Sequence, residues 1–255
     1  MYEQPFLTLP EELLLACAHP RTRVIKRPLS FYHALSGAVL AELELHGAIT
    51  IENGMVVELR PLTIGDPVID SIFETLVDDV RPTWLARLPG YPPEPGPDLP
   101  DGLVPRLRAA FRLPSVNSRA TMPVITWINL LSHTRNIEPR YLKAMEARGL
   151  LIAHRRRILG LVPFTSWTIS SAEHARAAAR IEQAVQAVTH GAGFGSPSKR
   201  TEYLVALLGA ADLGTRLYPG REHRHTVSRI SQVTRRHPIA VALSKARDSE
   251  RSNNW

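Results

Sequence analysis

Apolar residues recur every three or four positions over much of the chain, which is the spacing of a buried helix face. The longest such stretch runs from about residue 29 to 46, and its repeating residues are Phe31, Leu35, Val39 and Leu43. Gly47 follows in a position that suits the end of a helix. Comparable repeats predict further helices over residues 8–17, 66–80, 124–132, 138–148, 169–188, 201–218 and 225–236. The pattern predicts a mainly α protein, a single helical-bundle-like domain spanning residues 1–255.

Two segments predict β-hairpins that decorate this bundle. In ITIENGMVVEL, residues 49–59, Asn53 and Gly54 supply the two positive φ angles of a type I′ turn between alternating apolar residues. The stretch LLIAHRRRILGLVPFTSW, residues 150–167, predicts two further strands joined by a turn near its three arginines.

Carboxylates near predicted helix starts are explained by capping. Thr8 and Glu11 have the spacing of a capping box, and Asp66 precedes Pro67 at a first helical position. Asp66 and Asp70 could also form a pair for acid/base or metal chemistry, but no histidine or third carboxylate lies at a ligand-like spacing. We therefore expect backbone caps here.

The sequence changes character in its middle and at its end. Ten of the 21 prolines fall within residues 82–123. Because proline fixes φ and lacks an N–H donor, this stretch is expected to be an extended insertion in the domain, with at most a short helix near residues 106–112. The GAGFGSPSKR run at residues 191–200 lacks the ending of a phosphate-binding loop and is expected to link two helices. Residues 248–255 are expected to be disordered.

Composition points to anionic partners. The net charge is +7, and all but four of the 31 basic residues are arginines. Guanidinium groups match phosphate geometry, so nucleic acid, phospholipid headgroups and phosphorylated small molecules are candidates. The chain has no uninterrupted run of eighteen apolar residues and no signal peptide at its start, so we expect a cytoplasmic protein for which the inner face of the membrane is an accessible surface.

Cysteine and histidine usage indicates neither a metal site nor a cofactor. Cys17 is the only cysteine, which excludes an intramolecular disulfide and a cysteine-based metal cluster, and it is expected to be buried on a helix. His223, His225 and His237 lack acidic or cysteine companions and are expected to lie on a basic surface.

Four blocks in order, LTLPEELLLA, ALSGAVLAELELHGAI, TIGDPVID and ARGLLIAHRRRILGLVPFT, resemble the Golgi phosphoprotein 3 family, in particular its bacterial members. The similarity covers residues 5–80 and 124–240. It implies a single, mainly α-helical domain with several β-hairpins. Eukaryotic members are peripheral membrane proteins that recognise phosphatidylinositol 4-phosphate, hold the cytoplasmic tails of glycosyltransferases and self-associate through a hairpin. The resemblance therefore implies an adaptor with protein clients, and it supplies no catalytic residues.

The resemblance also implies positions for an anionic ligand or lipid site. The family's tryptophan falls on Arg27, with Phe31 and Tyr32 as the nearest aromatic residues, and a family arginine falls on Ser36. Of a family arginine pair, Arg135 matches, whereas the second position is Glu138 and Arg140 lies two residues on. The expected site consists of Arg27, Tyr32, Ser36, Arg135 and Arg140. The carboxylate of Glu138 argues against a polyanionic headgroup.

The family hairpin is similar to residues 155–164 here. Its arginines would meet anionic headgroups while its apolar residues enter the acyl boundary. Alternatively, the apolar arm packs on a sister subunit or on the core, and the arginines face water. The residues of this membrane or oligomer hairpin are Arg155, Arg156, Arg157, Ile158, Leu159, Leu161 and Val162.

The sequence is also compatible with two other classes of function. The order of elements between Val124 and Phe164 also fits a winged helix that binds DNA, but the family resemblance already explains this order. An enzyme with a refitted anion pocket would use the nearest proton-transfer groups, namely His33, His133, Tyr32 and Glu138. These residues form no recognisable nucleophile, base and orienting group, so a non-catalytic adaptor is favoured over an enzyme, and a nucleic-acid binder is the least favoured.

Overall fold

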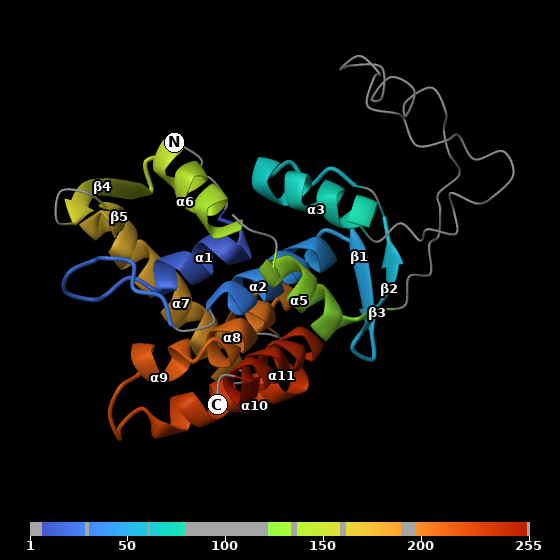
Figure 1. Cartoon of the computed structure of the whole chain (residues 1–255). Helices are drawn as coiled ribbons and strands as arrows, with labels where there is room; N and C mark the ends of the chain where they lie inside the picture. Colours follow the sequence, from blue (N-terminus) through green and yellow to red (C-terminus); the bar gives the residue numbers. More distant parts are fainter. Residues whose placement is uncertain are drawn as a thin grey trace, which may run out of the picture.

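The computed structural model describes residues 7–28, 31–60, 62–79, 122–133, 137–158, 162–189 and 197–253. Within these ranges most residues are helical, as predicted, and the strands form two small antiparallel sheets (Figure 1). The helices are α1 (Leu9–Ala16), α2 (Phe31–Leu45), α3 (Pro67–Asp79), α5 (Val124–His133), α6 (Ile137–Ala147), α7 (Ser171–Thr189), α8 (Lys199–Ala210), α9 (Leu213–Leu217), α10 (Arg224–Arg236) and α11 (Pro238–Asn253). The strands are β1 (Ile49–Glu52), β2 (Met55–Leu59), β3 (Met122–Pro123), β4 (Leu151–Ile158) and β5 (Val162–Ile169).

Helix α2 lies at the centre, with α1, α5, α8 and α11 packed around it (Figure 1). The apolar residues of its predicted repeat are all buried: Phe31, Leu35, Val39 and Leu43. Glu42 is buried as well, but its Oε1 accepts a bond of 2.8 Å from Arg200 and its Oε2 accepts the N–H of Leu9 at 2.7 Å. A carboxylate is tolerated in the core when both oxygens are paired. Glu42 thereby ties α1 and α8 to α2.

The first hairpin contains the predicted turn. Asn53 and Gly54 have φ angles of 52° and 75°, the positive pair that a type I′ turn requires. Glu52 pairs with Met55 across the turn. Strand β3, Met122–Pro123, lies at the end of the stretch predicted to be an insertion and adds to β2. Its proline is tolerated because β3 is an edge strand.

The carboxylates of Asp66 and Asp70 both accept backbone N–H groups. Asp66 accepts the N–H groups of Val68 and Ile69, each at 2.9 Å, and so caps α3 as predicted. Asp70 accepts two N–H groups of the preceding loop at 2.7 and 3.0 Å. These bonds account for both carboxylates without acid/base or metal chemistry.

The single helix predicted over residues 201–218 is interrupted. Helix α8 ends at Ala210 and α9 begins at Leu213. Asp212, between them, has a left-handed φ of 58°. A right-handed helix cannot continue through such a residue, and aspartate is one of the few side chains that tolerate it.

Residues 248–253, for which disorder was expected, continue α11. Ile239 and Leu243 anchor this helix in the core. Near its end Glu250 meets α2, where its carboxylate accepts the hydroxyl of Tyr32. The tail has no apolar stripe of its own, so tertiary contact holds it in the helix.

Several predictions fall outside the described residues. These include nearly all of the proline-rich stretch 82–123 with its short helix, most of the glycine-rich linker, Arg135, Leu159 and Leu161, and the last two residues. Predictions for the side chains of His133, Ile158 and Val162 also lie outside the description.

Candidate anionic-membrane interface

Residues 19–28, here called the basic segment, run beside the β4–β5 hairpin. The N–H of Ile25 donates to the carbonyl of Trp167 at 2.9 Å, and the N–H of Ile169 donates to the carbonyl of Arg23 at 3.1 Å. Val24 pairs with Thr168 in an antiparallel bridge. The segment therefore extends the hairpin on the open edge of β5. Its exposed basic residues are Arg21, Arg23, Lys26 and Arg27.

The hairpin itself exposes three consecutive arginines on β4, Arg155 to Arg157. Arg155 is 74% exposed and donates to Glu146 on α6 at 3.3 Å. In the part of the chain that the structure describes, Arg156 and Arg157 have no carboxylate partner. Two guanidinium groups on this strand are thus available to an external anion.

One face of the hairpin combines positive charge with exposed apolar area. Arg156 pairs with Phe164 across the strands, so their side chains lie on the same face. Ile152 is four residues before Arg156 and shares that face. The exposed fractions are 49% for Phe164 and 52% for Ile152. Arg155 and Arg157 alternate with Arg156 and therefore point to the opposite face of β4. We use the name basic hairpin surface for both faces of this strand end together with the adjoining segment, namely Ile152, Phe164, the three arginines, Arg21 and Arg23.

Arg27 forms an ion pair with Glu138 in the first turn of α6. Its Nη1 donates to both carboxylate oxygens. The side chain of Arg27 remains 51% exposed, whereas that of Glu138 is 17% exposed. Nearby, Arg216 on α9 donates to the carbonyl of Lys26, which fixes the end of the basic segment. The positive charge of Arg27 is therefore balanced inside the protein.

The other predicted lipid-site residues point to different partners. Arg140 donates to the hydroxyl of Ser71 on α3 at 3.1 Å. The hydroxyl of Tyr32 donates to Glu250 on α11. Ser36 is 1% exposed, and its hydroxyl donates to the carbonyl of Tyr32 at 2.9 Å. Arg135 lies outside the described residues. Among the described contacts, none joins Arg27, Tyr32 and Arg140 to one another, and their shared role stays a prediction.

Ile152, Phe164 and Glu250 are residues that sequence reasoning missed. The strand alternation offered a signal for Ile152 and Phe164, because a known register would have placed both beside Arg156. Glu250 carried no local signal, since its partners on α2 are more than 200 residues away in the sequence.

Cys17 is buried, as predicted, with 0% of its surface exposed. Burial raises the pKa of its thiol to about 12. The thiolate needed for nucleophilic attack is therefore scarce at neutral pH. Within the described ranges, no set of three or more histidine, cysteine or acidic side chains is grouped so that it could bind a metal ion. In the same ranges, the helices are too short or too polar to cross a bilayer.

Comparison with known families identifies the fold. Residues 9–249 match the family described as Golgi phosphoprotein 3 (GPP34). The chain belongs to this family. The resemblance of the four sequence blocks is thus confirmed at the level of the family, and the helical core with its hairpins is this family's domain. No curated protein matches the chain.

Proposed function

We propose that this family member is a non-catalytic adaptor that docks reversibly on anionic membrane surfaces through the basic hairpin surface. The observation that supports the proposal most strongly is the cross-strand pair of Arg156 and Phe164, which sets a guanidinium beside a half-exposed aromatic ring. Headgroups and the acyl boundary present the same combination of negative charge and apolar area.

The magnitudes fit reversible docking. A basic residue near an anionic surface contributes about 1 kcal/mol. Arg21, Arg23, Arg156 and Arg157 together give about 4 kcal/mol, which corresponds to only millimolar affinity. Burying the exposed halves of Phe164 and Ile152 adds about 2 kcal/mol. The two contributions together support binding that neither supports alone.

Family membership suggests a more specific hypothesis, in which the protein recognises phosphatidylinositol 4-phosphate. The ion pair between Arg27 and Glu138 and the burial of Ser36 favour general anionic surfaces over a highly charged headgroup. A phosphorylated small molecule is the alternative ligand for the expected site around Arg27 and Arg140. A peripheral position on the inner face of the membrane follows from the proposed docking.

Co-sedimentation with vesicles tests the proposal. The triple variant R155E/R156E/R157E is expected to lose most of its binding to vesicles that contain phosphatidylserine, while neither protein binds phosphatidylcholine vesicles. The matched control is R221E/R224E/R235E, which changes the net charge equally on exposed residues at or beside α10. Equal losses for the two variants would mean that net charge, rather than this surface, determines binding. Unchanged binding of the hairpin variant would exclude the membrane role of the hairpin.

A further inference from the structure

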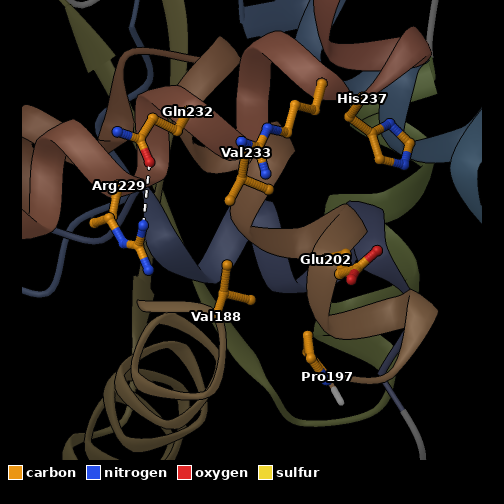
Figure 2. Close-up of a pocket in the computed structure, with 8 residues that line it drawn as sticks. Val188, Pro197, Glu202, Arg229, Gln232, Val233 and His237 are labelled. Atoms are coloured by element: carbon orange, nitrogen blue, oxygen red, sulfur yellow. Dashed lines mark hydrogen bonds between the residues drawn. The ribbon is translucent and has the colours of Figure 1, made fainter. Parts of the chain in front are cut away.

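A cavity of about 270 Å³ lies between α7, α8 and α10 (Figure 2). One wall is a single face of α10, because the residues that form it are spaced by three, four and seven positions: Arg229, Gln232, Val233 and Arg236. The opposite wall is formed by Val188 at the end of α7 and by Pro197 and Glu202 at the start of α8. His237 closes one side. The cavity is large enough for a small metabolite.

Close packing between α8 and α10 fixes the direction in which this face points. A Cβ added at Gly209 would lie 2.1 Å from the hydroxyl oxygen of Thr234, so only glycine allows this approach. The Thr234 hydroxyl lies 3.3 Å from the carbonyl of Ala206, and Ile230 is 1% exposed. Ile230 and Thr234 therefore face α8. The neighbouring side of α10, which carries Arg229 and Arg236, borders the cavity.

The cavity contains several hydrogen-bond donors. Arg229 donates to Oε1 of Gln232 at 3.3 Å (Figure 2). It also donates to the carbonyl of Thr189 at 3.3 Å. These bonds hold Arg229 in place and leave the amide N–H groups of Gln232 available. Arg236 has no carboxylate partner among the described residues. Its five N–H groups are therefore free to bind a ligand.

The charge of the lining selects a compact anion. Arg229 and Arg236 contribute two positive charges, and Glu202 contributes one negative charge. Burial lowers the pKa of His237, so its imidazole is neutral at pH 7. A net charge of +1 suits a single phosphate group and disfavours a polyphosphate. Guanidinium forks also match the tetrahedral oxygens of phosphate better than an amine would.

We propose that this cavity binds a single phosphate group, either as inorganic phosphate or as the ester of a small metabolite. The site is formed by α7, α8 and α10, whereas the basic hairpin surface is formed by β4, β5 and the segment beside them. The proposal therefore does not depend on membrane docking. A soluble phosphate compound could then bind the protein at a site separate from the basic hairpin surface.

The experiment is a titration of ¹⁵N-labelled full chain with inorganic phosphate, glycerol 3-phosphate and acetate, at constant ionic strength, followed by amide chemical shifts. Saturable shifts of α10 and of the start of α8 are expected for both phosphate compounds, with weaker binding of acetate. R236Q is expected to weaken phosphate binding about tenfold, the usual effect of losing a charge-assisted hydrogen bond. E202Q is expected to strengthen it.

R235Q is the matched control, because Arg235 and Arg236 are adjacent exposed residues of α10 and only Arg236 lines the cavity. It should change phosphate affinity less than twofold, and the amide spectrum of each variant verifies its fold. Tighter binding of glycerol 3-phosphate than of phosphate would identify an ester as the ligand, and equal binding would identify the free ion. Equal weakening by R236Q and R235Q, an absence of saturation, or tighter binding of acetate would overturn the proposal.

Discussion

Arg27 donates from Nη1 to both carboxylate oxygens of Glu138, a residue 111 positions further along the chain. The pair joins the basic segment to the first turn of α6. The family resemblance implies that these two positions belong to a lipid site, in which the family carries a tryptophan and an arginine. Here they form an ion pair with each other, so an external headgroup must compete with Glu138 for the guanidinium of Arg27.

Replacing Glu138 by glutamine is expected to strengthen binding to anionic vesicles. The change releases one basic residue, which is worth about 1 kcal/mol, or about fivefold in affinity. Co-sedimentation over a range of lipid concentrations measures the effect. E58Q is the control. Glu58 on β2 pairs with Arg60, so its replacement releases an arginine beside the β1–β2 hairpin instead of beside α6. A similar gain for both variants would contradict a role for Arg27.

Replacing Arg148 by methionine is expected to destabilise the fold by about 3 kcal/mol, because it leaves a buried carboxylate without its counter-ion. That carboxylate is Glu11, which is 1% exposed, accepts a bond of 2.5 Å from Arg148 and also accepts the N–H of Thr8 at 3.0 Å. Urea unfolding at pH 7 measures the loss. The double variant R148M/E11Q should recover most of it, and a double variant as unstable as R148M would contradict the explanation.

The stability lost in R148M should also shrink as the pH falls. Burial raises the pKa of Glu11 above its ordinary value. A carboxyl group with a raised folded-state pKa favours the folded state at low pH, and this contribution is lost as the pH rises through that pKa. Unfolding at pH 5 and at pH 7 tests the sign. A larger difference between R148M and the parent protein at pH 5 than at pH 7 would contradict it.

The pKa of His237 is shifted in the opposite sense. Burial lowers it, and the ring of His237 packs against Tyr203 with centroids 4.2 Å apart. A depressed histidine pKa contributes stability above the unfolded-state value of about 6.5, and this stability is lost as the pH falls through the folded-state pKa. H237Q should therefore be less sensitive than the parent to a change from pH 7.5 to 5.5 in thermal unfolding. Equal sensitivity would show that other groups determine this pH dependence.

Local chemistry made much of the fold predictable. The Asn53-Gly54 turn, the Asp66 cap before Pro67 and the four-residue repeat of α2 each depend on neighbours within a few positions, and each is confirmed. The break at Asp212 was missed because an aspartate accepts helical and left-handed backbone alike, and no proline marks the site.

The candidate surfaces were less predictable, because they depend on contacts between distant segments. The bond between Tyr32 and Glu250 and the pair of Arg27 and Glu138 join residues that no periodicity relates. The cavity beside Arg236 depends on how closely α10 approaches Gly209. Arginine content indicated an anionic partner, but only the packing separates arginines with an internal partner from those that face outward.

The exposed apolar pair on the hairpin also allows the alternative of self-association. Replacing Ile152 and Phe164 together by serine is expected to weaken vesicle binding without changing the molar mass in solution, if the membrane is the partner of this face. Light scattering after size-exclusion chromatography gives the mass. A parent oligomer that dissociates in I152S/F164S would instead assign the face to a second copy of the chain.

The most direct test of the membrane-docking claim is the environment of position 164. Because Cys17 is fully buried, a nitroxide can be attached selectively to the variant F164C, and S231C on the exposed side of α10 serves as the control. On vesicles that contain phosphatidylserine, the label at 164 is expected to gain accessibility to oxygen and lose accessibility to a water-soluble nickel complex, while the label at 231 changes in neither respect. A label at 164 that stays equally accessible to the nickel complex on vesicle-bound protein would contradict docking through the hairpin.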